Sequence, residues 1–402
     1  MSNPSILIVT ECFYPEEFNI NDVALFWKNE DYDVDVLTLA PTYPLGKVFS
    51  GYKNSFFQKD EYRGINIFRV RAVSGYRDSV IKKILKYLNF MVFGSIASIF
   101  IGRKYDYIFG FNMGSLTSMM PAVIIRKLYK KPTMFWIQDV WPDSVYAYGF
   151  KKTKILSTFL DIFVKFMYHD ITSIAISSKG FKVKIKPYIK KDLNLYYAPN
   201  WASELDMSMP PAILNKVQKV HFTFAGNVGK VQNLENIVNA FQLLSKDYKE
   251  KTQLNIIGDG SNLEKIKLLS ENCSNIVFFG KKSREVMASY YKSSSFLIVS
   301  LVDKSIFSNT VPGKLQTYIA AKKPILAIIN GETADIVSDN NLGISVDPSN
   351  MSLIKEAFEK CIDMPEIEKY KFIKNNAKLL QTTFNKDIIL KKMTGQLINN
   401  SD

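Results

Sequence analysis

The stretch Ser308–Pro324 (SNTVPGKLQTYIAAKKP) joins a strand end, a loop and the start of a helix. The apolar run Ser295–Leu301 before it is typical of a buried strand. Pro312 suits the first turn of a helix. The loop residues 308–311 therefore present backbone N–H groups at the carboxyl end of a strand, where α/β sheets hold anions. Lys314 adds a positive charge; the alternative is an ordinary crossover with a solvated lysine.

The same alternation of buried strands and helices continues on both sides of this stretch and predicts doubly wound parallel sheets. In the second half of the chain the further strands are expected at His221–Gly226, Gln253–Gly258, Ile276–Gly280, Pro324–Ile329 and Gly343–Val346. In the first half they are expected at Ser5–Thr10, Val34–Thr38, Arg63–Arg71, Tyr107–Gly110, Thr133–Ile137 and Ile174–Ser177. The alternating pattern of Arg63–Arg71 places it at a sheet edge.

A stretch rich in Pro, Ser and Asn interrupts the alternation at Tyr196–Lys216 and predicts a linker. We therefore expect an α/β protein of two Rossmann-like domains that face each other across a cleft. The first domain covers residues 1–198, the linker 199–216 and the second domain 217–384. A final helix in 385–402 could cross back to the first domain.

The composition indicates a globular protein with an anionic partner. The 402 residues are 47% hydrophobic and carry a formal net charge of +14. A charge of this size suits nucleic acid, an acidic membrane surface or a phosphorylated ligand. The three cysteines and two histidines do not have metal-ligand spacing, so we expect no metal site. Asp31, Asp33 and Asp35 precede or enter a strand and are interpreted as surface carboxylates.

The N-terminal segment is interpreted as a first strand and not as a signal peptide. The longest apolar segment, Tyr87–Ile101, falls short of the ~20 residues that a membrane span needs.

Five motifs together resemble a known family. They are YPEEFNIND near the N-terminus, WIQDVWPDSV at Trp136–Val145, PNW at Pro199–Trp201, FAGNVGKVQNLENIVNAF at Phe224–Phe241 and PGKLQTYIAAKKPILAIINGETADI at Pro312–Ile336. The chain resembles the retaining glycosyltransferases of family 4, which have the GT-B fold and need no metal. It is most similar to bacterial enzymes of O-antigen and capsule assembly, including N-acetyl-L-fucosamine transferases.

This resemblance implies a function at a membrane. Such enzymes move a sugar from a nucleotide diphosphate sugar to a lipid-linked acceptor, here expected to be a UDP-sugar and an undecaprenyl diphosphate glycan. They work in the cytoplasm, bound peripherally to the inner face of the cell membrane. No cofactor and no nucleic-acid partner are expected.

The chain departs from the family pattern at the donor site. The family's Glu-x7-Glu carboxylates align with Asn309 and Thr317, and its phosphate-binding Arg and Lys align with Asn227 and Gln232. Lys230 and Lys314 are the nearby cations that could replace them. Backbone amides and fixed cations can stabilise a leaving diphosphate without a metal. The predicted donor-binding residues are Asn227, Lys230, Gly280, Lys281, Asn309, Thr310, Val311, Lys314 and Thr317.

Two loops of the first domain are candidates for acceptor binding. Gln138, Asp139 and Asp143 follow the strand TMFWI, and Asp139 is the predicted base or acceptor-positioning group, so that Asp139 and Lys314 are the catalytic candidates. The alternative is that Asp139 or Asp143 caps the following helix. In the first strand-end loop Glu16 and Asn19 are predicted to contact the acceptor, with Glu11 and Glu17 nearby; solvated charges are the alternative.

A basic and apolar helix over about Ser79–Gly102 is expected to contact the membrane. Lysines suit anionic headgroups, and an apolar face suits the acyl boundary. The residues predicted to make this contact are Lys82, Lys83, Lys86, Phe90 and Phe93. The alternative is a buried crossover helix with a solvated basic start.

Three other functions remain open from the sequence. One is a GT-B relative that epimerises a UDP-sugar, although two histidines supply its chemistry poorly. Another is a non-catalytic scaffold of polysaccharide assembly, which the missing glutamates allow. A nucleic-acid-binding protein is suggested by charge alone, but most aromatic residues fall inside strand and helix patterns.

Overall fold

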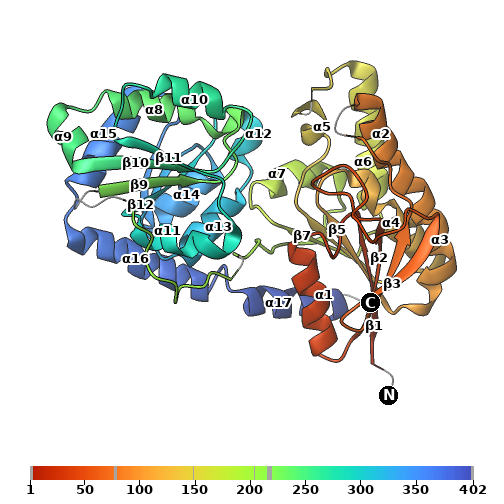
Figure 1. Ribbon diagram of the computed structural model, residues 1–402. Coiled ribbons are helices and arrows are strands. Elements are labelled where there is room, and N and C mark those ends of the chain that lie inside the picture. The colour runs from red at the N-terminus through yellow and green to blue at the C-terminus, as the bar shows by residue number, and fades with distance from the viewer. Residues whose placement is uncertain (1–2, 77–78, 148, 203, 215–219, 400–402) are drawn as a thin grey trace. The chain divides into compact units, whose positions relative to one another are not determined.

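The computed structural model describes residues 3–76, 79–147, 149–202, 204–214 and 220–399, without the side chains of Val80 and Lys83. The chain forms two compact units. The N-terminal unit contains Met1–Pro199 and Asp387–Asp402, and the C-terminal unit contains Asn200–Lys386 (Figure 1). The division thus falls one residue beyond the predicted end of the first domain, and the last helix returns to that domain.

The N-terminal unit is built on one sheet, which in the described residues has eight strands in the order β3-β4-β2-β1-β5-β6-β7-β8. All neighbours are parallel apart from the antiparallel pair of β3 and β4. The strands are β1 (Ser5–Thr10), β2 (Asp33–Leu39), β3 (Phe57–Tyr62), β4 (Ile65–Val70), β5 (Tyr107–Asn112), β6 (Thr133–Ile137), β7 (Ser173–Ile176) and β8 (Asn194–Tyr197).

Two strands of this sheet, β3 and β8, are missing from the sequence-based prediction. β8 is a half-buried edge strand whose last two residues fall in the stretch that was predicted to be a linker. The predicted edge strand Arg63–Arg71 corresponds to β4, but β3 lies outside it and forms the edge. The sequence of β3, FQKDEY, is mostly polar, and its side chains alternate between exposed and half-buried. An exposed edge strand does not produce the apolar run on which the prediction depended.

Helices cover both faces of this sheet. They are α1 (Asn19–Asn29), α2 (Val80–Asn89), α3 (Ser95–Ile101), α4 (Met120–Tyr129), α5 (Asp143–Ala147), α6 (Lys154–Tyr168), α7 (Phe181–Ile185) and α17 (Lys386–Asn399). The last of these attaches through Trp27 of α1, whose indole N–H donates to the Thr394 hydroxyl at 2.7 Å. Because Trp27 is fully buried, this bond satisfies a donor that water cannot reach.

A single helical run, interrupted by the π-helical turn Phe90–Gly94, connects α2 and α3. Its segment Ile84–Lys104 has 21 residues and a mean hydropathy of 1.7, which is long and apolar enough to cross a membrane by length and composition alone. The expectation that the apolar segment is too short is therefore wrong. Core helices of soluble proteins can meet the same criterion, but here only 22% of the most apolar window is buried.

Phe90 was predicted to face lipid, and this prediction is wrong. Its side chain is fully buried in the core of the N-terminal unit. The buried face of the helix contains Phe90 together with the small residues Gly94, Ala97 and Ser98. A Cβ at Gly94 would lie 2.9 Å from Pro121 of α4, so the two helices pack too closely for larger side chains there.

The interpretation of Asp35 as a surface carboxylate is also wrong. The residue is 8% exposed and accepts hydrogen bonds from the Tyr105 hydroxyl at 2.5 Å and from Lys104 Nζ at 2.9 Å. Asn66 Nδ2 donates to its other oxygen at 2.8 Å. These bonds join β2 to β4 and to the segment before β5, so Asp35 has a structural role at the start of the strands.

The C-terminal unit is a second doubly wound domain, with a parallel sheet of order β11-β10-β9-β12-β13-β14 in its described residues. The strands are β9 (Val220–Ala225), β10 (Thr252–Ile257), β11 (Ile276–Gly280), β12 (Phe296–Ser300), β13 (Ile325–Ile328) and β14 (Gly343–Val346). Each coincides with a predicted strand to within a residue or two, since buried parallel strands give continuous apolar runs.

Helices pack on both faces of this second sheet. They are α8 (Leu234–Gln242), α9 (Lys246–Lys251), α10 (Leu263–Leu269), α11 (Met287–Ser293), α12 (Ser305–Ser308), α13 (Gly313–Ala320), α14 (Glu332–Asp339), α15 (Met351–Ile362) and α16 (Glu366–Gln381). Figure 1 shows α8, α10 and α15 on one side of the strands and α11, α13 and α16 on the other. This arrangement brings the loops after β9, β10, β12 and β13 to one edge of the sheet.

Candidate functional site

The loops at the carboxyl edge of the C-terminal sheet are held together by backbone hydrogen bonds. Gly226 N–H, which follows β9, donates to Ile257 O at 2.8 Å, and Val228 N–H donates to Asp259 O at 2.8 Å. Gly258 N–H, which follows β10, donates to Gly280 O at 2.9 Å. The turn Gly258-Asp259-Gly260 thus connects the segments that follow β9, β10 and β11 through its backbone. A rigid edge of this kind can position a ligand.

Lys314 is the principal charged group of this edge. It lies in the first turn of α13, and its Nζ is 3.7 Å from the centre of the Phe224 ring. The same Nζ donates to Gln232 Oε1. No ion pair joins Lys314 to a carboxylate in the described part of the chain. Burial lowers the pKa of this amine to about 7, because the charged form is poorly solvated and has no counter-ion.

The backbone leaves just enough space for this lysine. Gly226 has a φ of +128°, and a Cβ there would lie 2.7 Å from Lys314 Cε. A larger residue would have to displace the lysine stem and would also be strained by the backbone. The glycine therefore allows the amine to reach the carboxyl end of β9.

Sequence reasoning missed the two partners of Lys314. Gln232 was noted as the position of a family lysine, but its contact with Lys314 was not foreseen. Phe224, which is fully buried in β9, offers the face of its ring to the amine. The available signal was an aromatic residue near the carboxyl end of the central strand, next to the Gly226 turn.

The loop between α12 and α13 packs on the segment that follows β13. A Cβ at Gly331, whose φ is +80°, would lie 2.1 Å from Ser308 O. The hydroxyl of Thr333 donates to Thr310 O at 3.2 Å. The loop of residues 308–311 is therefore fixed by close backbone contact before the helix that contains Lys314.

The side chains that replace the family's two glutamates make local bonds. Asn309 Nδ2 donates to Ser305 O at 3.2 Å, and Thr317 Oγ1 donates to Gly313 O at 3.1 Å. Thr310 Oγ1 likewise donates to Phe307 O at 3.1 Å, as does the Thr310 amide at 3.2 Å. In α-helical geometry the amides of Gly313 and Lys314, in the first turn of α13, have no partner within the helix. If an anion binds at this edge, the amides at the start of α13 are therefore better candidates for its donors than the Thr310 amide.

The other predicted donor-site residues lie at the same edge and are open to solvent. Asn227 and Lys230 follow β9 and are exposed, and Gly280 and Lys281 at the end of β11 are also exposed. Val311 is half-buried immediately before α13. Their roles in binding stay predictions.

Buried carboxylates mark the carboxyl edge of the N-terminal sheet. Glu11, directly after β1, is 6% exposed, and Glu16 is 4% exposed, so the alternative of solvated charges is wrong for both. Glu17 is exposed, as that alternative expected. Burial raises the pKa of Glu11 and of Glu16. Asn19, the other predicted acceptor residue of this loop, is the first residue of α1 and is half-buried.

Glu16 organises the loop that follows β2. One of its carboxylate oxygens accepts from the Thr42 amide at 2.8 Å and from the Tyr43 amide at 2.6 Å. Bonds of this kind, from two backbone amides to one carboxylate, fix loop geometry strongly. Glu16 thus binds backbone amides of the loop after β2. Its contact with an acceptor stays a prediction.

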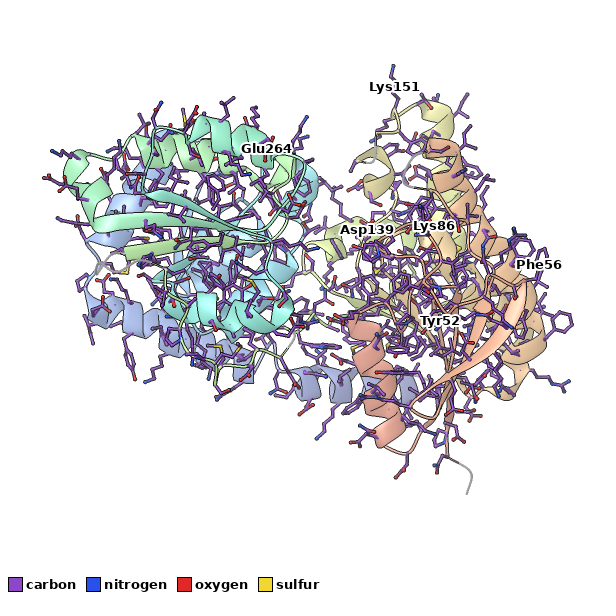
Figure 2. The ribbon with its side chains drawn as sticks, in the orientation of Figure 1. Tyr52, Phe56, Lys86, Asp139, Lys151 and Glu264 are labelled. Carbon is purple, nitrogen blue, oxygen red and sulfur yellow. The ribbon has the colours of Figure 1, made fainter. Side chains whose placement is uncertain are left out.

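Lys86 was predicted to contact lipid headgroups, and the structure contradicts this. Its side chain is 13% exposed, and its Nζ lies 3.7 Å from the Glu11 carboxylate and 4.6 Å from the centre of the Tyr76 ring. Burial opposes the charge of Lys86, but Glu11 outweighs it and the pKa is raised. Figure 2 shows Lys86 and Asp139 within the N-terminal unit, whereas Phe56 and Lys151 project from its outside.

The segment after β6 contains the carboxylate predicted to act on the acceptor. Burial raises the pKa of Asp139 to about 6, although the neighbouring Ser144 side chain and the Val140 amide favour its ionised form. Gln138, immediately before it, is half-buried, and its backbone N–H donates to Asn112 O at 2.9 Å. Asp143 is the first residue of α5 and pairs with Lys184 at 2.8 Å. Asp139 therefore has the properties of an acid–base group, and Asp143 those of a surface ion pair.

The remaining predicted membrane residues have mixed positions. Lys82 is exposed, and the side chain of Lys83 lies outside the described residues. Phe93 is half-buried and packs against Phe56, with ring centres 5.8 Å apart. The most exposed large apolar side chains of α2 and α3 are two that were not predicted to contact the membrane, Ile81 (71% exposed) and Phe100 (80% exposed).

Comparison with known proteins relates this edge geometry to a family. Residues 209–380 match the family model described as glycosyl transferases group 1, a range that covers most of the C-terminal unit. The chain is 27% identical over 227 residues to the probable glycosyltransferase WbjE of Pseudomonas aeruginosa. That match covers 53% of this chain and 56% of WbjE, so the chain spans little more than half the length of this relative.

Two further comparisons extend over more of the chain. The putative colanic acid biosynthesis glycosyl transferase WcaI of Escherichia coli is 21% identical over 311 residues, which are 72% of this chain and 74% of WcaI. The structure of trehalose-6-phosphate from E. coli bound with UDP-2-fluoro glucose has a TM-score of 0.75 at 9% identity and covers 98% of each chain. At this identity the likeness concerns the fold alone: the chain has two Rossmann-like units of the GT-B type.

Asp139→Asn is expected to stabilise the protein above pH 6. The raised pKa means that the folded state holds a proton that the unfolded carboxyl has already lost, so ionisation of Asp139 costs stability. We expect the free energy of unfolding at pH 8 to rise by about 1–3 kcal/mol relative to the original protein. The gain should shrink as pH falls from about 6 to about 4, when the folded carboxyl is protonated too.

Urea unfolding followed by circular dichroism at several pH values measures this difference. Asp143→Asn is the matched control, because Asp143 is half-exposed and paired with Lys184. Equal effects of the two substitutions, or a gain independent of pH, would show that Asp139 is not desolvated.

Lys314→Met is expected to change how the free energy of unfolding depends on pH above pH 7, on the alkaline side of the range affected by Asp139. The pKa of the folded amine is about 7, whereas the unfolded amine keeps its proton up to about 10.5, so the unfolded state binds more protons between these values. In this range the free energy of unfolding of the original protein should rise relative to the variant, by about 1 kcal/mol per pH unit. Unfolding between pH 7 and 9.5 tests this, with Lys246→Met, at a side chain that is 89% exposed, as the control. A pH-independent difference would contradict it.

Proposed function

We propose that the protein is a glycosyltransferase that moves a sugar from a nucleotide diphosphate sugar to a lipid-linked glycan in bacterial surface polysaccharide synthesis. The donor is a UDP-sugar, with an N-acetylated deoxyamino sugar such as L-fucosamine as its glycosyl group. The acceptor is a glycan on undecaprenyl diphosphate, used for capsule or O-antigen. The transfer retains the anomeric configuration, proceeds without a metal and takes place at the cytoplasmic face of the membrane.

The observation that carries this proposal is the desolvated amine of Lys314, a half-buried residue. A cation that is desolvated and lacks a carboxylate partner costs stability, which a binding site tolerates when its ligand supplies the missing charge. Lys314 lies at the carboxyl edge of a parallel sheet and at the start of a helix, where phosphates bind. A nucleoside diphosphate brings the counter-ion that the chain itself does not provide.

The same position suits the chemistry of transfer. The bond between the sugar's anomeric carbon and the β-phosphate oxygen breaks, and its electron pair leaves with the diphosphate. Lys314 in its charged form and the first amides of α13 stabilise that developing charge. The acceptor hydroxyl forms the new bond to the anomeric carbon, and its proton passes to the donor phosphate or to a carboxylate. Because the anion itself favours the protonated amine, donor binding restores the charge that burial suppresses.

Asp139 is the carboxylate proposed to position the acceptor hydroxyl. It follows β6 at the carboxyl edge of the N-terminal sheet, and its pKa of about 6 leaves it mainly ionised at neutral pH but still able to accept a proton. The relatives support the acceptor class: WcaI is named for colanic acid biosynthesis, and a glycosyltransferase structure with a TM-score of 0.62, WaaG, is named for lipopolysaccharide biosynthesis.

A membrane-bound acceptor agrees with the outer face of α2 and α3. Ile81, Ile96 and Phe100 are 71%, 49% and 80% exposed, which is unusual for large apolar side chains in water. No acidic residue occurs between positions 79 and 104, whereas exposed Lys82 and Lys104 can meet anionic headgroups. We propose that this face rests in the headgroup region of the membrane.

The positions of the histidines argue against the epimerase alternative. His221 is the second residue of β9 and therefore lies at the amino end of its strand. His169 directly follows α6 and is largely exposed beside Asp170. Neither histidine lies at the carboxyl edge of a sheet, where the substrates of α/β folds bind.

Calorimetric titration with UDP and with GDP in the presence of EDTA tests the proposal. We expect saturable binding of UDP, weakened at least tenfold by Lys314→Met because the diphosphate loses its counter-ion. The exposed Lys246→Met is the control and should bind as the original protein does. Binding of neither nucleotide, or equal binding by both variants, would contradict the assignment of Lys314 to a donor site and would favour a non-catalytic scaffold.

Membrane binding is tested by flotation with vesicles of phosphatidylcholine and phosphatidylglycerol. Ile96→Ser with Phe100→Ser should reduce the bound fraction severalfold, because both side chains are exposed and neither change opens the core. Leu268→Ser is the control, since Leu268 is 72% exposed on α10 of the C-terminal unit. Undiminished flotation of the double variant would exclude this face as the contact.

A further inference from the structure

An apolar groove runs between α2 and α6 in the N-terminal unit. Its volume is about 350 Å³. One wall comes from the end of α2 and the π-helical turn, with Leu88 and Met91, and the other comes from α6, with Phe159 and Phe163. Such a space is costly in water, because it exposes apolar surface on both sides.

The inner end of the groove lies beside the residues proposed to contact the acceptor. Trp141 and Val145 line it, and they follow Asp139 in the same short segment after β6. Ser115 and Thr117, which follow the neighbouring strand β5, also line this end. The groove thus reaches the carboxyl edge of the sheet.

Two hydroxyls in the groove are already hydrogen-bonded within the protein. Ser115 Oγ and Thr117 Oγ1 lie 2.7 Å apart, and Thr117 Oγ1 donates to Tyr87 O at 3.2 Å. Most of the other lining residues have purely apolar side chains. Its chemistry suits a hydrocarbon.

The outer rim of the groove is apolar and surrounded by cations. Phe159 is 64% exposed and Ile84 40% exposed at the opening, and Ile155, one turn before Phe159 on α6, is 87% exposed. Lys151 and Lys152 precede α6, Lys154 is its first residue, and all three are exposed. In the segment 150–168 the single acidic residue is Asp161, which accepts from the Tyr188 hydroxyl at 2.6 Å.

We propose that this groove binds one hydrocarbon chain of the lipid that carries the acceptor, with the lysines at its rim facing anionic headgroups. The inference rests on the proposed function, because it names a binding site for the acceptor's lipid part. An apolar rim bordered by lysines matches a lipid with a charged head. A chain held here fixes the diphosphate end of the acceptor near the segment that contains Asp139.

The experiment uses farnesyl phosphate, a short isoprenoid phosphate, and the fluorescence of Trp141 as readout. Trp141→Phe identifies the part of the signal that comes from the groove. We expect saturable binding, and binding of geranyl phosphate, which is five carbons shorter, should be at least tenfold weaker, because each buried CH₂ contributes about a fourfold gain. Inorganic phosphate, as competitor, should not displace the ligand.

A matched pair of variants locates the site. Phe159→Gln should weaken farnesyl phosphate binding at least tenfold, whereas Ile162→Gln, on the same helix and equally exposed at 64% but outside the groove, should not. Both substituted side chains are exposed, so neither change should unfold the protein.

Three outcomes would overturn the proposal: no binding of farnesyl phosphate, equal effects of the two variants, or displacement by inorganic phosphate. None of these depends on the donor site. If UDP still binds to Phe159→Gln while farnesyl phosphate does not bind to any form, the lipid groove fails and the proposed transferase stands. If farnesyl phosphate binds but UDP does not, the lipid groove stands and the proposed donor site fails.

Discussion

The partial burial of the Lys314 amine without a carboxylate partner is the constraint on which the candidate site of the C-terminal unit depends. An ion pair at this position would satisfy the lysine and stabilise the empty protein, but it would also compete with an anionic ligand. The structure instead provides a ring face from Phe224 and one amide oxygen from Gln232. These partners orient the amine but carry no negative charge, and the charge remains available for a phosphate. The cost of this arrangement is a pKa that falls to about 7.

The sequence predicted the fold well where burial determines the pattern. β1 and β6 were located to the residue, because strands buried on both faces give continuous apolar runs. β3 was missed because an edge strand that faces solvent is mostly polar. The position of Lys314 at the start of a helix and at the carboxyl edge of the sheet could be predicted from its place after a strand, a loop and Pro312. The roles of Phe224 and Gln232 could not, since they depend on tertiary contacts between β9, the loop after it and α13.

The helix from α2 to α3 shows why the sequence predicted only some of its outward-facing side chains correctly. A soluble amphipathic helix turns its large apolar residues to the core. Here the buried face beyond Phe90 contains Gly94, Ala97 and Ser98, and large side chains such as Ile96 and Phe100 point outward. Gly94 follows Phe90 by four positions, and Ala97 and Ser98 follow Gly94 by three and four, and this spacing marks the packed face. Lys86 was assigned to the outer face although it reaches inward to Glu11, a contact that no local pattern reveals.

In each unit, burial shifts the pKa of one ionisable group towards neutral pH, but the two groups have opposite charges. In the C-terminal unit burial suppresses a positive charge at Lys314, and in the N-terminal unit it suppresses a negative charge at Asp139. Each group lies at the carboxyl edge of its sheet, where strand ends and helix starts leave polar backbone groups for ligands. The proposed transfer releases a diphosphate and removes a proton from the acceptor hydroxyl, so it would need the amine in its charged form and the carboxylate as a proton acceptor. An anionic donor favours the charged amine directly, since it supplies the counter-ion. Burial thus leaves both groups with pKa values close to neutral pH, so that a charged ligand can change the protonation state of either.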